Sequence, residues 1–187
     1  MKSILTYIII IIVSANLQAQ DVKNFTLINA KDGKEVSLSN YTSSKAVVIV
    51  FTSHECPFDN YYKDRIKELI QTYAGKVQFL LINSNTEEQE SAEQMAIHYT
   101  DLQVPYLADK DQAVMSALGA KKTPEVFILN LAGGKFIIAY SGAIDDNPQS
   151  AKDARQYFLK EAIEKVLAGQ KIDVSTQRAT GCTVRKK

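Results

Sequence analysis

Cys56 is the residue of this chain whose type and position best suit redox chemistry. It lies in the sequence V-V-I-V-F-T-S-H-E-C-P-F-D, between an apolar β-branched run and a segment with helical periodicity. A thiol at a strand-to-helix junction lies near unpaired backbone N–H groups and the positive end of a helix dipole. Because that setting favours the thiolate, which is the nucleophile, we expect Cys56 to be redox-active. The alternative is a passive buried cysteine.

Cys182 is the only other cysteine, the sixth residue from the end of the chain. It could resolve a sulfenic acid or a mixed disulfide on Cys56. It could instead form a permanent stabilising disulfide with Cys56, or stay free, or pair between molecules. Gly181 before it permits the sharp turn that would present this thiol. The sequence leaves these roles open.

Charged neighbours would oppose or assist a thiolate at position 56. Glu55 and Asp59 carry negative charge, which would raise the pKa of the thiol. His54 could supply compensating positive charge or move a proton, although an exposed loop histidine is the plainer interpretation. The sequence therefore predicts competing electrostatic influences on one sulfur.

The remaining candidate residues are expected to have solvated or structural roles. The two histidines and two cysteines lack a recognised metal-binding spacing, so we expect neither a metal nor another cofactor. His98 falls in an amphipathic segment that favours a structural or solvated role. Lys63 and Arg65 follow Cys56 by one to two helical turns, where a solvated face is the expectation and a position facing the site the alternative.

The N-terminal residues 1–20 resemble a secretory signal peptide, with a positive start, an apolar run and small residues before a cut after Ala19 or Gln20. An uncleaved membrane anchor is the alternative. Cleavage would leave about 167 residues with almost no net charge, enough for one domain, predicted over 21–172 with a tail over 173–187. We expect an exported, periplasmic or secreted protein without nucleic-acid partners or stable membrane insertion, in a compartment where disulfides persist.

Hydrophobic periodicity predicts an α/β domain with a mixed sheet and helices on both faces. The apolar runs at 46–51 and 77–83 suit buried strands. Further strands are predicted at 25–29, 35–38, 126–129 and 135–140, the last two joined by a Gly133-Gly134 turn. Helices are predicted from Pro57 to about Tyr73, after a capping box formed by Thr86 and Gln89, over 111–118, and over 153–167.

This order, with a cysteine at the first buried strand-to-helix junction, resembles the thioredoxin fold. The stretch F-T-L-I-N-A-K-D-G-K-E-V-S-L-S-N-Y is similar to the N-terminal hairpin of the redoxin branch, which includes alkyl hydroperoxide reductase/thiol-specific antioxidant and TlpA/ResA-like proteins. The segments G-A-I-D-D-N-P and G-C-T-V-R-K resemble an exported redoxin group. Phe51 also stands five residues before Cys56, as in thioredoxin-like active-site strands. The resemblance implies that Thr123-Pro124 contains a cis-proline facing Cys56, whose exposed backbone can pair with an extended substrate strand.

Two departures from the family patterns affect the expected reaction. Thioredoxin-like dithiol enzymes carry a second cysteine where this chain has Asp59. Typical peroxiredoxins have proline where this chain has Ile49, and Thr or Ser where it has Ser53. Ser53 therefore fits, and its hydroxyl could hydrogen-bond to a peroxide or to the sulfur.

The leading functional hypothesis is a thiol-dependent oxidoreductase of the peroxiredoxin-like kind. Cys56 would reduce peroxide, Cys182 would resolve the sulfenic acid, and an external dithiol would reduce the pair. Ser53, Thr123 and Pro124 complete the expected site. The alternatives are a thiol–disulfide exchange protein acting on protein disulfides, and a non-catalytic module that holds an extended peptide beside Pro124.

Overall fold

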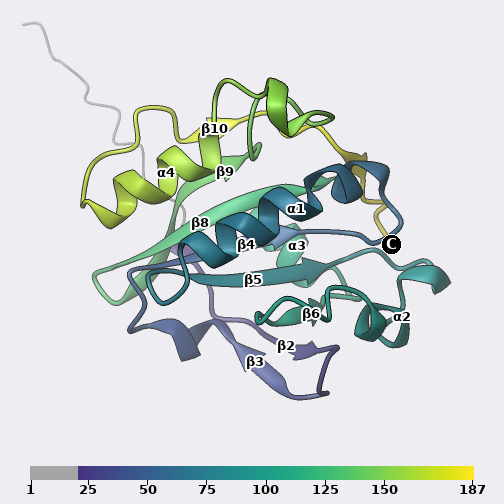
Figure 1. The fold of residues 1–187 in the computed structure, drawn as a ribbon. Helices are drawn as coiled ribbons and strands as arrows, with labels where there is room; N and C mark the ends of the chain where they lie inside the picture. The colour runs from purple at the N-terminus through teal and green to yellow at the C-terminus, as the bar shows by residue number, and fades with distance from the viewer. Residues whose placement is uncertain (1–20) are drawn as a thin grey trace, which may run out of the picture.

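Nine strands form one mixed sheet within residues 21–187, the part of the chain that the computed structural model describes (Figure 1). The predicted signal peptide lies outside these described residues. The order across the sheet is β1-β9-β8-β4-β5-β6-β2-β3, and β10 pairs with β9. The strands are β1 (Asp21–Val22), β2 (Thr26–Asn29), β3 (Glu35–Ser37), β4 (Ala46–Phe51), β5 (Gln78–Asn83), β6 (Tyr106–Ala108), β8 (Glu125–Ala132), β9 (Lys135–Gly142) and β10 (Thr176–Gln177).

Helices pack on both faces of this sheet, as the sequence predicts. Apolar side chains of α1 and α4 share one core with Val48 and Val50, while those of α3 share the opposite core with Ile49 and Phe51. The α-helices are α1 (Pro57–Thr72), α2 (Ala92–Ile97), α3 (Ala113–Leu118) and α4 (Phe158–Leu167), and short 3-10 helices occupy Leu38–Tyr41, Glu88–Glu90 and Ala151–Asp153.

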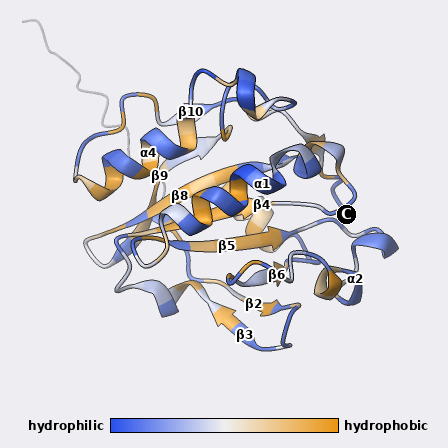
Figure 2. Ribbon diagram, in the orientation of Figure 1, coloured by the Kyte–Doolittle hydropathy of each residue, from blue (hydrophilic) through white to orange (hydrophobic). Residues whose placement is uncertain are grey.

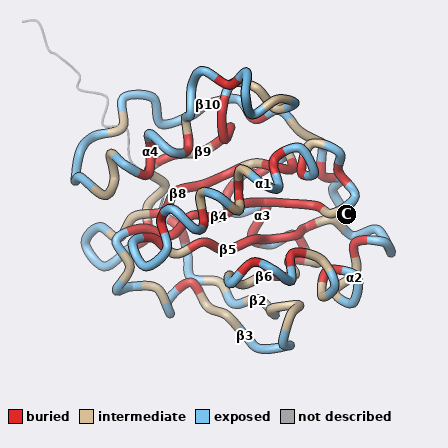
Figure 3. The backbone as a smooth tube through the Cα atoms, viewed as in Figure 1, coloured by how far each residue is buried: buried red, intermediate tan, exposed pale blue. Residues whose placement is uncertain are grey.

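Strand β4 is buried along its whole length, which explains its continuous apolar sequence (Figures 2 and 3). It pairs in parallel with β5 and antiparallel with β8, so successive side chains enter opposite cores. Each fully buried branched side chain contributes about 1.5–3 kcal/mol of transfer free energy. The end of β4 is therefore a rigid platform for the loop that carries Cys56.

Most predicted elements are confirmed, but two helix starts are wrong. The N-cap of α2 is Ser91, which accepts a hydrogen bond from the Gln94 amide, and Thr86 does not begin a helix. Helix α4 starts at Phe158 rather than at 153. The segment before it is bound to the loop at Asp146, whose carboxylate accepts the Arg155 amide at 2.9 Å. These long-range contacts take the place of the helical bonds that the local pattern predicts.

The C-terminal segment lies against the domain in two places. Strand β10 pairs in parallel with the end of β9. Strand β11 (Cys182–Thr183) then pairs antiparallel with β7 (Lys122–Thr123), just before Pro124. Gly142, with a φ of +124°, permits the first contact, because a Cβ there would lie 1.6 Å from the Gln177 carbonyl oxygen. The predicted tail is thus an ordered part of the fold.

Replacing Gly142 with alanine is expected to detach β10 and lower the free energy of unfolding by about 1–3 kcal/mol. The added methyl group would overlap the Gln177 backbone, and a φ of +124° is itself strained for alanine. Urea unfolding and limited proteolysis of the C-terminal segment would measure the effect. Gly33→Ala is the matched control, because its φ is +70° but no atom lies within 4 Å of the new Cβ. Equal losses in the two variants would contradict the steric argument.

Candidate redox site

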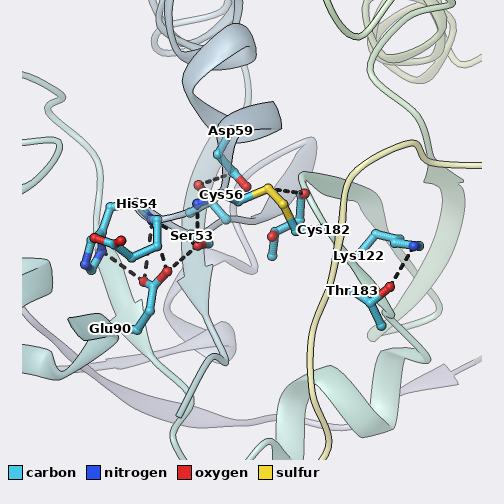
Figure 4. Close-up of a disulfide and its surroundings, with 11 residues drawn as sticks. Ser53, His54, Cys56, Asp59, Glu90, Lys122, Cys182 and Thr183 are labelled. Atoms are coloured by element: carbon cyan, nitrogen blue, oxygen red, sulfur yellow. Dashed lines mark hydrogen bonds and ion pairs between the residues drawn. A yellow bond between two sulfur atoms is a disulfide. The ribbon is translucent and has the colours of Figure 1, made fainter. Parts of the chain in front are cut away.

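The two cysteines are joined in a disulfide across 126 residues of sequence (Figure 4). Their Cα atoms are 6.0 Å apart. Cys56 is the N-cap residue of α1, directly before Pro57, and is only 3% exposed. The predicted position at the start of a helix is therefore confirmed. Of the three roles open for Cys182, the structure favours those in which it pairs with Cys56.

Ser53 shapes the loop between β4 and α1. Its Oγ accepts hydrogen bonds from the amides of Glu55, at 3.2 Å, and Cys56, at 3.1 Å. Its single proton is donated to the carboxylate of Glu90. Because a hydroxyl has only one proton to donate, this Ser53 geometry does not provide the expected donor to the sulfur or to a peroxide.

Glu90 is a buried carboxylate, 2% exposed, that ties this loop to the neighbouring strand β5. Besides the Ser53 hydroxyl, it accepts the Glu55 amide at 3.1 Å and the side-chain amide of Asn83 at 2.6 Å. Several donors are what a buried carboxylate requires. No sequence pattern points to Glu90, because it lies in an ordinary charged run and Ser53 is distant in the sequence.

The His54 side chain is buried beside Glu90, with 3% exposed, so the interpretation as an exposed loop histidine is wrong. Its Nδ1 lies 3.0 Å from a Glu90 carboxylate oxygen, and its Nε2 lies 2.5 Å from the Gln89 carbonyl oxygen. The ring stacks on His98 at a centroid distance of 4.1 Å. Burial lowers the pKa of His98, and the nearby His54 and Lys63 lower it further. Figure 4 shows the His54 ring directed toward Glu90 and away from the disulfide.

Asp59 lies beside the disulfide, where dithiol enzymes of this fold carry their second cysteine (Figure 4). Its carboxyl is fully buried and accepts the Thr52 hydroxyl at 2.5 Å. The second carboxyl oxygen has no hydrogen-bond partner, and neither has the buried Thr123 hydroxyl. Burial is the main reason that the pKa of Asp59 rises from 3.8 to about 8. A largely neutral carboxyl therefore lies beside the sulfur at neutral pH.

The loop before β8 completes the site. The Thr123-Pro124 peptide bond is cis, as the resemblance implies. The carbonyl oxygen of Thr123 lies 3.3 Å from Cys56 Sγ, and Thr123 is also the register partner of Cys182. The structure thus brings together all five expected site residues. A cavity of about 270 Å³ opens beside the disulfide.

Asp59→Asn is expected to stabilise the oxidised protein at about pH 8 and to do so less as the pH falls toward about 4. The folded state keeps a proton on Asp59 that the unfolded state releases above its pKa of 3.8. Stability from the protonated group is therefore complete below that pKa and is lost as the pH rises through about 8. Asparagine has no such dependence.

Urea unfolding across this pH range, with the disulfide intact, measures the effect. Asp64→Asn, at an exposed position on the same helix, is the matched control. A pH dependence of stability that Asp59→Asn leaves unchanged would contradict the assignment.

Glu90→Ala is expected to lower the free energy of unfolding by about 2–4 kcal/mol, because several buried donors lose their acceptor. Hydrogen exchange at the amides of Glu55 and Cys56 should accelerate at the same time. Glu88→Ala, at an exposed position two residues earlier, should change neither property. Unaltered amide exchange in Glu90→Ala would show that Glu90 does not hold the loop.

Several solved structures have a similar fold. An uncharacterized conserved protein from Geobacillus kaustophilus is 28% identical, with a TM-score of 0.81 over 90% of this chain and 92% of its own. Peroxidoxin BcpB from Mycobacterium tuberculosis (16% identity, TM-score 0.58) and the protein named as thiol:disulfide interchange protein DsbE from Chlorobium tepidum (17%, 0.60) each cover 80% of this chain and 96% of their own. These two likenesses show the thioredoxin-like fold alone.

No curated protein matches the chain significantly. The Redoxin family model, in contrast, matches residues 17–157, which include Cys56 and Pro124. Together with the fold and the cysteine at the start of α1, this match shows that the chain belongs to the Redoxin family.

Proposed function

We propose that this chain is a thiol oxidoreductase that alternates between the Cys56–Cys182 disulfide and the dithiol. It exchanges this disulfide with cysteine pairs of other proteins. The supporting observation is the pairing of Cys182 with Thr123, which holds a second sulfur against the cysteine at the start of α1. Redox chemistry as such follows from the family and the fold. The choice of protein disulfides as substrates is the proposal.

The reductive step begins at Cys182. Cys56 is buried, whereas Cys182 is partly exposed and borders the cavity beside the disulfide. A thiolate of an external dithiol attacks Cys182 Sγ, and the Cys56 sulfur leaves with the bonding electron pair. The N-terminus of α1 stabilises that leaving thiolate. The second thiol of the reductant then releases Cys182, so the reductant becomes a disulfide and this chain a dithiol.

The oxidative step runs at Cys56. Its thiolate attacks a disulfide of the substrate protein, forming a mixed disulfide and expelling one substrate thiolate. Cys182 then attacks the Cys56 sulfur and releases the second substrate thiolate. Because the docked tail brings Cys182 to bonding distance of Cys56, its return to the groove supplies the resolving thiol that position 59 lacks.

Peroxide reduction is the second candidate. A sulfenic acid on Cys56 would need only Cys182 to condense to the observed disulfide, with loss of water. Two observations favour disulfide exchange over it. The Ser53 proton is donated to Glu90, so it is not available to a peroxide. The guanidinium of Arg65, the cation of α1 that could have faced the site, is bound instead to Asp145 at 2.5 Å and to the Asn147 carbonyl at 2.7 Å. The expectation of a solvated Arg65 is accordingly wrong.

Two single variants separate these functions. For disulfide exchange, the wild type should reduce a protein disulfide at the expense of a dithiol, Cys56→Ser should be inactive, and Cys182→Ser should accumulate a mixed disulfide detectable by mass spectrometry. Peroxide should be consumed slowly. Fast peroxide consumption, with a trappable sulfenate in Cys182→Ser, would favour peroxide reduction instead. Full biological activity in Cys56→Ser would indicate a peptide-binding module.

Export is part of the proposal and rests on the N-terminal sequence. Residues 21–187 contain no helix long and apolar enough to cross a membrane. An oxidising compartment would suit a protein whose two cysteines form a disulfide. N-terminal sequencing of the protein recovered from the native host would test whether cleavage occurs after Ala19 or Gln20.

A further inference from the structure

The C-terminal segment lies beside Pro124 as an extended strand, with the geometry of a bound peptide. Cys182 pairs with Thr123 and Thr183 with Lys122, antiparallel, and the Val184 amide donates to the Lys121 carbonyl at 3.1 Å. These contacts involve backbone atoms, which every polypeptide carries. A strand of another protein can therefore form the same ladder.

We propose that this surface, the groove formed by Lys121–Pro124 and the adjoining core of α3, binds extended polypeptides in which glycine directly precedes a reactive cysteine. The chain's own segment 179–184 occupies it here as an internal template. The inference rests on the proposed function and specifies the substrate class: disulfide-containing proteins that present a Gly-Cys strand.

The requirement for glycine comes from the closest backbone approach in the site. A Cβ at position 181 would lie 2.2 Å from the Thr123 carbonyl oxygen, 2.7 Å from its carbonyl carbon and 3.1 Å from Pro124 N. All three atoms belong to the backbone of the loop that contacts Cys56, so they cannot move aside as a flexible side chain would. Any larger residue before the cysteine would push the strand away from β7.

The residues on either side of Gly181-Cys182 also contact the groove or face solvent. Val184 is 5% exposed and packs into the core that contains Met115 and Leu118 of α3, and Ala179 is 8% exposed. Thr180 and Thr183 are exposed. The groove therefore selects glycine directly before the cysteine and an apolar residue two after it.

Once the disulfide is reduced, only non-covalent contacts hold the bound tail. Beyond the short β-ladder and Val184, its end is held by Gln112, whose side-chain amide bonds to the Arg185 carbonyl at 2.7 Å and to the Lys187 amide at 2.9 Å. Such hydrogen bonds contribute about 1 kcal/mol each in net terms. The contacts that remain are therefore weak enough for a substrate strand to displace the tail.

The test uses the full chain with Cys182→Ser, in which Cys56 is the only thiol. The probe is the peptide A-T-G-C-T-V, its cysteine linked to thionitrobenzoate. Cys56 attacks the peptide sulfur, a new disulfide forms, and thionitrobenzoate leaves with the bonding electrons. Release is followed by absorbance, and the mixed disulfide is identified by mass spectrometry. The matched peptide A-T-A-C-T-V differs by one methyl group.

The glycine peptide should react about tenfold faster than the alanine peptide, a difference of about 1.4 kcal/mol, because the added methyl group overpacks against the Thr123 backbone. Adding Val184→Asp, which weakens binding of the internal tail, should accelerate the glycine peptide further. Equal rates for the two peptides would overturn the inference. The symmetrical thionitrobenzoate disulfide serves as the small reference substrate. If it reacts rapidly while the peptides show no discrimination, the proposed function stands and the inference fails. If Cys56 does not react with it either, both fail.

A second variant tests the same contact within the chain. Gly181→Ala should lower the equilibrium constant for formation of the Cys56–Cys182 disulfide in a glutathione buffer by at least about tenfold, because the tail can no longer approach Thr123. Thr180→Ala, which changes an exposed neighbour, should leave that equilibrium unchanged. An unaltered equilibrium in Gly181→Ala would contradict the steric basis of the inference.

Discussion

The pairing of β11 with β7 is the interaction on which the redox site depends. It involves two residues from each strand, yet it determines which sulfur can reach Cys56. Without it, Cys182 would belong to a segment whose sulfur could sample a large volume. Held against Thr123, the Cys182 sulfur lies where a disulfide can form, because the packed strands β4 and β8 fix the position of Cys56. A small local contact thus converts two remote cysteines into one redox unit.

Electrostatics at Cys56 are a balance between the helix and several carboxyl groups. The N-terminus of α1 favours a negative sulfur, while Glu55, Asp59 and Glu90 lie close enough to oppose it. Two features limit that opposition. Burial keeps a proton on Asp59 at neutral pH, and the charge of Glu90 is shared among several hydrogen-bond donors. The fold therefore tolerates acidic residues around a site that must carry a thiolate in the proposed exchange reaction.

The sequence was sufficient for the fold and for the main site residues, because those signals are local. The apolar run of β4, Pro57 at the first turn of α1 and the Gly133-Gly134 turn each specify their own structure. Cys56 could be identified from its position beside such elements, whereas the role of Pro124 followed only from the resemblance to thioredoxin-like proteins. Glu90 and the burial of Asp59 could not, since both depend on contacts between segments that meet only in the folded chain. The same holds for Arg65, whose partner Asp145 is 80 residues away.

The replacement of a second active-site cysteine by Asp59 links these observations. With a cysteine three residues after the first, exchange is completed within one helical turn and a distant strand is not required. With an aspartate there, the resolving sulfur must arrive from elsewhere, and the groove beside Pro124 is where a strand can approach Cys56. The tail uses that groove, so in the proposed exchange reaction resolution and substrate binding compete for one surface. Turnover then requires that the tail and the substrate strand occupy it in succession, which ties the chemistry of Cys56 to the docking of residues 179–184.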